Sequence, residues 1–304
     1  MPTITTTTNA PIVTAAAIRF VQLLLANRAT LRGHPALINL GAFGAGRPGS
    51  GSLTSQFSLF GLDGYDTLAS VAEGAAVTET ALTMALRTIA VARRSLRRSL
   101  SDQMRTVDPT GTLNIPRFAI DGFVSANVTL TNLIAAMMSG FASSVGSSGV
   151  DFDHDTFLEA KATLIEAKVP GPYLSLMPET HFSRWMVDLE GRAGVTQWRP
   201  ATAEMQMLKG PGFQGTYDNV DIITAPGCPT SGSDHIGGMF GLGAIGYAEM
   251  PVEYPQSAFI LLQEGPIAVE EIRTGTSGLT DTVTHYHVGT VEIEDARGVQ
   301  LLAA

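Results

Sequence analysis

The stretch 117–141 constrains the fold more than any other part of the chain. Its apolar residues recur at the spacing of an α-helix. Pro116 stands just ahead of the stretch, where proline is tolerated, and glycines follow it at 140, 146 and 149. At 1.5 Å per residue the helix would be roughly 37 Å long. The apolar face consists of Ile120, Phe123, Val124, Leu130, Leu133, Ile134, Met137, Met138 and Phe141.

The residues ahead of this helix alternate between loop and regular structure. Residues 2–12 are Thr-rich and uncharged, which predicts an extended arm, and residues 13–31 follow a helical pattern. Residues 41–52 contain five Gly and one Pro and predict a loop. Residues 80–91 alternate as a strand does. From about Ser95 the apolar spacing becomes four, which predicts a helix.

The residues behind the long helix give a mixture of helices and strands. Asp151 to Asp155 precede an amphipathic helix, and these acids are interpreted as helix N-capping residues. Pro178 opens a second helix that carries Trp185. Strands are predicted at 173–177, 220–224, 258–263, 267–272, 281–288 and 290–295, and loops at 191–217 and 225–238.

Composition excludes several classes of protein. Charged residues make up 15% of the chain and apolar residues 44%, so the chain has too little charge and too much apolar surface to be disordered. Cys228 is the only cysteine, which excludes a disulfide framework. No run of about 18 uncharged apolar residues predicts a membrane span. Met1 is followed by no basic segment, so we expect no signal peptide.

Charge is distributed unevenly along the chain. Residues 1–120 carry 11 Arg, no Lys and 6 acids, a net charge of +5, whereas residues 121–304 carry a net charge of −14. An acidic chain is a poor bulk binder of nucleic acid, because neutralising phosphates needs clustered basic residues. Opposite charges on the two halves favour association of the chain with copies of itself.

Motifs that carry chemistry find little support. The GxGxxG pattern occurs at Gly44–Gly49 and again at Gly241–Gly246, but neither is followed by the helix that a dinucleotide site requires. His285 and His287 would share one face of a strand without a third metal ligand in view. Ser233, Asp234 and His235 are neighbours and cannot adopt the geometry of a catalytic triad. Cys228 is interpreted as a loop residue. We expect neither an enzyme nor a cofactor.

A cluster of arginines stands out between the predicted strand and the long helix. Arginine suits fixed bidentate pairing with carboxylates, and no aromatic residue is interleaved for base stacking. Pairing between subunits is therefore preferred over nucleic-acid binding, and a solvated face stays open as an alternative. The candidate inter-subunit contacts are Arg87, Arg93, Arg94, Arg97, Arg98, Arg105, Phe43 and Arg47.

The order of these elements resembles the major capsid proteins of tailed double-stranded-DNA bacteriophages, which have the Hong Kong 97 fold. The segment from Ala81 to Asp102 is similar to the returning strand of their extended loop, and 117–141 to their spine helix. Val169–Pro178 and Gly212–Thr224 resemble segments of their axial domain. Gly238–Ala248 resembles the strand that follows, and Ser277–Leu302 the closing strands, with Gly289 in a turn.

The resemblance implies an α+β, Hong Kong 97-like capsid fold with five parts. These are an N-terminal arm with a helix, an extended β-hairpin loop, a peripheral domain with the spine helix, an axial domain, and closing strands of the peripheral domain. Their expected ranges are 1–36, 37–92, 93–149, 150–265 and 266–304.

The implied function is structural. Subunits would assemble as hexamers and pentamers into an icosahedral shell around packaged double-stranded DNA, with assembly in the host cytoplasm. A separate scaffolding protein, a portal and a decoration protein are expected partners, and DNA would be held without sequence specificity. The only lysines are Lys161, Lys168 and Lys209, so no loop lysine is available for the covalent bonds of some relatives. The alternatives are an encapsulin-like shell and a soluble nucleotide-dependent enzyme.

Overall fold

The computed structural model describes residue 31 and residues 34–42, 54–60, 84–107, 115–192, 197–209, 212–250, 260–264, 266–274 and 278–304. The predicted arm, the first GxGxxG pattern and all but the last residue of the helix predicted at 13–31 lie outside these residues. Phe43 and Arg47 lie outside them as well. The structure therefore leaves these predictions as they stand.

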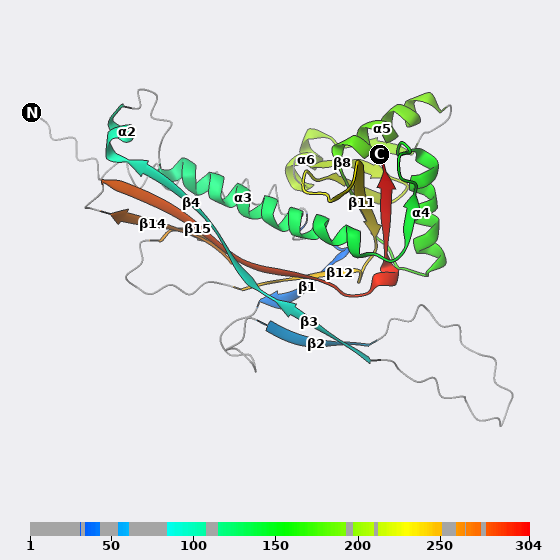
Figure 1. Ribbon diagram of the computed structural model, residues 1–304, viewed down its shortest axis with the longest axis horizontal. Coiled ribbons are helices and arrows are strands. Elements are labelled where there is room, and N and C mark those ends of the chain that lie inside the picture. The colour runs from blue at the N-terminus through cyan, green and yellow to red at the C-terminus, as the bar shows by residue number, and fades with distance from the viewer. Residues whose placement is uncertain are drawn as a thin grey trace, which may run out of the picture.

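A six-stranded sheet and one long helix form the elongated part of the molecule (Figure 1). The central strand is β15, and the others pair around it in the order β1-β12-β15-β14-β13, with β4 also on β15. The strands are β1 (Leu37–Ala42), β4 (Ala92–Ser101), β12 (Ile245–Glu249), β13 (Ile260–Glu264), β14 (Ile267–Thr274) and β15 (Leu279–Glu292). A short helix, α2 (Asp102–Val107), follows β4.

Strand β15 is paired along both of its edges. One edge pairs with β4 over ten residue pairs, from Leu279 with Ser101 to Val288 with Ala92. The other edge pairs first with β14, up to Tyr286, and then with β12 from Val288 onward. The predicted turn at Gly289 is therefore wrong, because Gly289 pairs with Ala248 of β12 and the strand continues to Glu292.

The long helix α3 (Ile115–Ala136) lies along β4 and β15 and continues as a 3₁₀ turn to Gly140 (Figure 1). Its inward stripe is buried at Phe123, Ala126, Leu130 and Ile134, which confirms the predicted apolar face. A Cβ atom at Gly122 would overlap the hydroxyl of Thr284 on β15. The missing side chain at Gly122 therefore makes room for the side chain of Thr284 between helix and sheet.

By length and composition alone, residues Asp121–Gly140 could cross a membrane. In the structure the same residues supply the buried stripe of α3, which packs into the main hydrophobic core with Phe240 and Tyr247. A helix that covers the core of a globular fold explains this hydropathy.

An eight-stranded sheet forms the second part, with strand order β5-β16-β11-β6-β9-β8-β7 and β10 paired to β11. The helices α4 (His154–Glu166), α5 (Glu179–Gly191) and α6 (Ala203–Lys209) belong to this part (Figure 1). The strands are β5 (Ser144–Gly146), β6 (Tyr173–Met177), β7 (Trp198–Pro200), β8 (Phe213–Tyr217), β9 (Val220–Thr224), β10 (Thr230–Ser231), β11 (Asp234–Phe240) and β16 (Gly298–Ala303).

An aromatic cluster fills the core of this second part. Trp185 on α5 is fully buried, and its ring centroid lies 5.2 Å from that of Phe157 and 5.5 Å from that of Tyr217. The ring of Trp198 on β7 stands edge-on to it at 5.3 Å. Such tilted and edge-on pairs add to the stabilisation from apolar burial. The helix predicted after Pro178, which carries Trp185, is confirmed as α5.

Two strands form a separate hairpin at the far end of the long sheet. Strand β2 (Thr54–Phe60) pairs antiparallel with β3 (Met84–Ala90) over its whole length. Within the described residues, β2 pairs with no other strand. The chain passes from β3 through Val91 directly into β4, so hairpin and sheet are joined by one nearly continuous path (Figure 1).

Three further predictions from local patterns are wrong. The helix predicted from Ser95 is strand β4 up to Ser101, and α2 begins only at Asp102. The spacing of Leu96 and Leu100 fits both a helix and one face of a strand, and the long ladder with β15 decides for the strand. The loops predicted at 191–217 and 225–238 contain β7, α6, β8 and the start of β11, which long-range pairing holds in place.

Helix α4 ends on a residue with a left-handed backbone. Lys168 has φ of 56° and lies between two capping bonds, its own N–H to the Ile165 carbonyl and the Val169 N–H to the Leu164 carbonyl. Glycine is the residue that tolerates this conformation best. We expect Lys168→Gly to raise the free energy of unfolding by about 0.5 kcal/mol in urea denaturation, since relief of strain outweighs the added freedom of the unfolded chain. An unchanged or lower value would contradict this.

Candidate subunit-interface site

Four arginines of the cluster lie on strand β4 and alternate between the two faces of the six-stranded sheet. Arg93 and Arg97 share the face turned away from α3, together with Ser95 and Ser99. Arg94 and Arg98 point to the face that α3 covers, where Arg94 is paired across the ladder with Tyr286. Each face therefore gives its arginines a different set of neighbours.

On the face away from α3, Asp281 of β15 meets Arg97 and Ser99. The Asp281 carboxylate accepts a hydrogen bond from Ser99 Oγ at 2.5 Å and one from Arg97 Nη2 at 2.6 Å. These bonds lower the pKa of Asp281. The bond from the Ser99 hydroxyl has the larger effect and the bond from the Arg97 guanidinium the smaller one. Asp281 is buried while Arg97 is mostly exposed, so this arginine is held at its tip and still reaches the surface.

Two histidines continue this face. His285 lies 3.3 Å from Glu270 through Nε2 and 2.9 Å from Arg93 through Nδ1. Burial lowers the pKa of both His285 and His287, and the charge of Arg93 lowers it further. The two imidazoles share a face, as predicted. Among the described residues no group of three His, Cys, Asp or Glu side chains could hold a metal ion.

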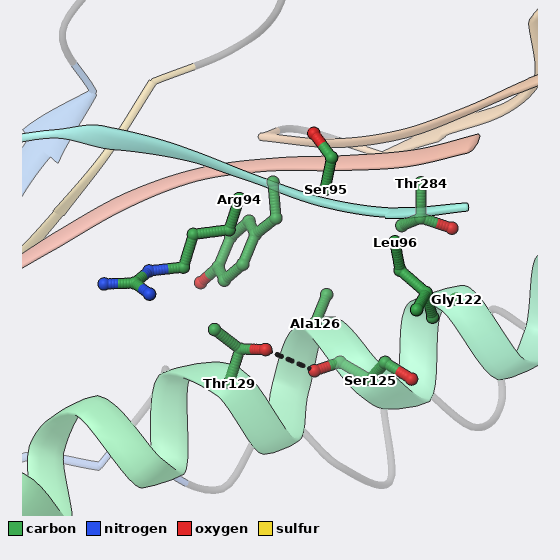
Figure 2. Close-up of a pocket in the computed structure, with 9 residues that line it drawn as sticks. Arg94, Ser95, Leu96, Gly122, Ser125, Ala126, Thr129 and Thr284 are labelled. Carbon is green, nitrogen blue, oxygen red and sulfur yellow. Dashed lines mark hydrogen bonds between the residues drawn. The ribbon is translucent and has the colours of Figure 1, made fainter.

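On the face toward α3, Arg98 and Arg94 differ sharply. Arg98 Nη2 lies 2.5 Å from Asp121 Oδ2 and so ties β4 to the helix. Arg94 forms no hydrogen bond or ion pair with any residue of the described chain, and its side chain is exposed. Its side chain lies between β4 and α3, and its guanidinium points toward the Thr129 end of a small pocket (Figure 2).

The remaining predicted contact residues have different outcomes. Arg87 on β3 donates from Nε to the carbonyl of Ile293 at 3.0 Å, which ties the hairpin to the residue that follows β15. Arg105 lies on α2, and Phe43 and Arg47 lie outside the described residues. The acids Asp121 and Asp281, which pair with the cluster inside one chain, were not identified from the sequence. An inter-subunit role for the cluster stays a prediction.

The other motifs of the sequence have structural roles. Gly241–Gly246 forms the turn from β11 into β12, and no helix follows it, so this GxGxxG pattern is not a dinucleotide site. Asp153 caps α4 by accepting the Thr156 N–H at 2.8 Å, which confirms the capping interpretation. Cys228 lies between strands, and burial raises the pKa of its thiol to about 12.

A buried histidine makes the eight-stranded part sensitive to acid. His181 is fully buried and stacked on Phe152, and burial lowers its pKa to about 4. The unfolded chain binds a proton below about pH 6.5, whereas the folded chain does so only near pH 4. Stability is therefore lost between these two values as the pH falls.

We expect about 3 kcal/mol of the free energy of unfolding to disappear between pH 7 and pH 4 through His181 alone. Urea denaturation of wild type and His181→Gln at both pH values measures this. The variant should lose about 3 kcal/mol less than wild type on acidification, with the pH 7 comparison as the control for packing. Equal losses in both proteins would contradict the assignment.

Comparison with known proteins finds similarity in structure and none in sequence. No family model matches the chain, and no curated protein matches it in sequence. Solved structures do match. The capsid structure of cyanophage P-SCSP1u aligns with a TM-score of 0.57 at 11% identity, over 88% of this chain and 86% of that one.

Two further structures match at similar levels. The capsid of Ralstonia phage GP4 aligns with a TM-score of 0.54 at 12% identity, over 82% of this chain and 83% of that one. A structure of Mycobacterium phage Che8 aligns with a TM-score of 0.54 at 14% identity, over 82% of this chain and 84% of that one. The chain has the Hong Kong 97 fold.

The Hong Kong 97 fold accounts for the arrangement seen here. The predicted α+β class, the long helix and the β-hairpin are all confirmed, and the similarity covers most of the chain, as the sequence resemblance predicted. In this fold the arginine strand β4 lies under α3 at the centre of the elongated part, and the hairpin projects from its end (Figure 1).

Proposed function

We propose that this chain is the major capsid protein of a tailed bacteriophage. It would assemble as hexamers and pentamers into an icosahedral shell around double-stranded DNA. The observation that carries the proposal is the match of fold and extent to phage capsid structures over more than four fifths of the chain. The role is structural, so the chain has no reaction of its own to catalyse.

The parts of the chain take names in this proposal. The six-stranded sheet with α3 is the peripheral domain with its spine helix, and the eight-stranded sheet with α4 and α5 is the axial domain. Five strands cross the boundaries expected from the sequence. Strands β1, β12 and β13 belong to the peripheral sheet, and β5 and β16 belong to the axial sheet.

The hairpin β2–β3 supports a role in contacts between subunits. A two-stranded hairpin is marginally stable in water by itself. Its outer strand β2 has a free edge within the described chain, and such edges are ready to pair with another chain. Overlap with neighbouring subunits would stabilise the hairpin, and closure of a shell would multiply many weak contacts of this kind.

The partners follow from the same proposal. Separate scaffolding and portal proteins and a decoration protein would act with the shell, and DNA would be enclosed without sequence-specific contacts. The acidic 121–304 part suits an inner surface that does not grip the genome. Subunits would be joined without covalent bonds, since the three lysines of the chain, Lys161, Lys168 and Lys209, all lie outside the hairpin and the segment between its strands.

Electron microscopy in negative stain tests the proposal. The protein is expressed alone and together with the genes that neighbour its own, and the lysates are inspected for particles. Regular shells tens of nanometres across that contain DNA are the expected result after co-expression with the packaging genes. Shells filled with a protein cargo would indicate an encapsulin-like compartment instead. If neither preparation gives shells, the capsid function is wrong.

A further inference from the structure

A small pocket opens between the spine helix and the arginine strand. It has a volume of about 190 Å³ and is lined by Gly122, Ser125, Ala126 and Thr129 from α3, by Arg94, Ser95 and Leu96 from β4, and by Thr284 and Tyr286 from β15. The residues from α3 are small and recur at helical spacing, so they leave room below the strand (Figure 2). The pocket exists because α3 has no long side chain here.

The one cationic group at this pocket has no partner in the described chain. On β3 and β4, Arg87, Arg93, Arg97 and Arg98 each bond to an acceptor of the same chain. Arg94 lies among them with none, and it contributes to the wall of the pocket. A guanidinium presents a planar fork of donors that fits a carboxylate in two hydrogen bonds.

The chain itself contains a segment whose negative charge is complementary to the arginines. Residues 61–83, between the two strands of the hairpin, hold four acids and no Lys or Arg, whereas residues 84–105 hold six Arg and one acid. The acids are Asp63, Asp66, Glu73 and Glu79. Every copy in an assembly of this chain carries both segments. The acidic segment of one copy is therefore available as an oppositely charged partner for the arginine strand of another.

We propose that the Arg94 pocket binds a carboxylate from segment 61–83 of a second copy of this chain. The guanidinium would receive the carboxylate at the rim, and the small residues of α3 would admit the side chain that carries it. This inference rests on the proposed function and names one specific contact within it. The pocket would thereby fix how far the hairpin of one subunit reaches over the spine helix of the next.

Charge reversal tests this contact. Arg94→Glu is expected to raise the subunit concentration needed for shell formation at least about tenfold, because each lost contact recurs around the shell. The thermal midpoint of unassembled subunits should stay that of wild type, since Arg94 has no partner within the described chain. Arg199→Glu, the same change at an exposed arginine on strand β7, is the matched control and should assemble like wild type.

A second charge change identifies the partner. Asp63→Lys, Asp66→Lys, Glu73→Lys and Glu79→Lys are each combined with Arg94→Glu, and at least one pair should restore assembly to within about threefold of wild type. The proposal is overturned if Arg94→Glu assembles like wild type, if Arg199→Glu fails equally, or if no pair restores assembly. Because wild-type shells are measured in the same series, these failures are distinct from a failure of the capsid function.

Discussion

Gly289→Ala is expected to lower the free energy of unfolding by about 3 kcal/mol. Gly289 lies inside β15, next to the end of β3, where the chain passes from the hairpin into β4. A Cβ atom there would overlap the backbone carbonyl of Ala90 and press on the side chain of Ile89. A backbone carbonyl cannot rotate out of the way as a flexible side chain can, so strands would have to separate. Urea denaturation of unassembled subunits measures the loss.

Gly191→Ala is the matched control for this substitution. Gly191 ends α5, and a Cβ atom there would meet no other atom within 4 Å. We expect its free energy of unfolding to lie within about 0.5 kcal/mol of wild type. If Gly289→Ala is equally mild, β3 and β15 do not approach each other as the structure shows.

Trp185→Ala is expected to cost about 4 kcal/mol of the free energy of unfolding. The indole is fully buried and forms tilted or edge-on contacts with Phe157, Tyr217 and Trp198. Its removal leaves a cavity among residues from two helices and two strands, which cannot all move inward at once. Chemical denaturation followed by tyrosine absorbance or far-ultraviolet circular dichroism measures the loss.

Val187→Ala on the same helix serves as the comparison. Val187 is 71% exposed, so its truncation removes little buried surface. The change should stay within about 0.5 kcal/mol of wild type. A loss below about 1.5 kcal/mol for Trp185→Ala would show that the aromatic cluster does not hold the eight-stranded part together.

Local sequence patterns correctly predicted the elements that are identified by residues within the segment itself. The apolar stripe of α3, the strand at 173–177 and the helix after Pro178 all show this. Patterns failed where distant pairing decides. The period of four at Leu96 and Leu100 is compatible with either element, and only the ladder with β15 makes it a strand. Gly289 looks like a turn residue because glycine marks both turns and close approaches of backbone.

The region of the candidate site could be predicted from the sequence, but the pairing of its individual arginines could not. The density of arginines on 87–105 identified the region from sequence alone. Which arginine is left without a partner depends on the register of β4 against β15 and on the position of Asp121 on α3. Both are tertiary facts, because they join residues far apart in the sequence. Arg94 therefore could not be separated from its neighbours before the fold was known.

The nearly continuous path from β3 into β4 has a mechanical consequence. A pull on the hairpin acts along β4, parallel to its ladder with β15. The ten residue pairs of that ladder are then loaded together in shear, whereas a pull across the strands would open them one after another. Strain that neighbouring molecules impose on the hairpin is thus shared over the whole length of the sheet. The ladder between β4 and β15 would therefore break in one cooperative step.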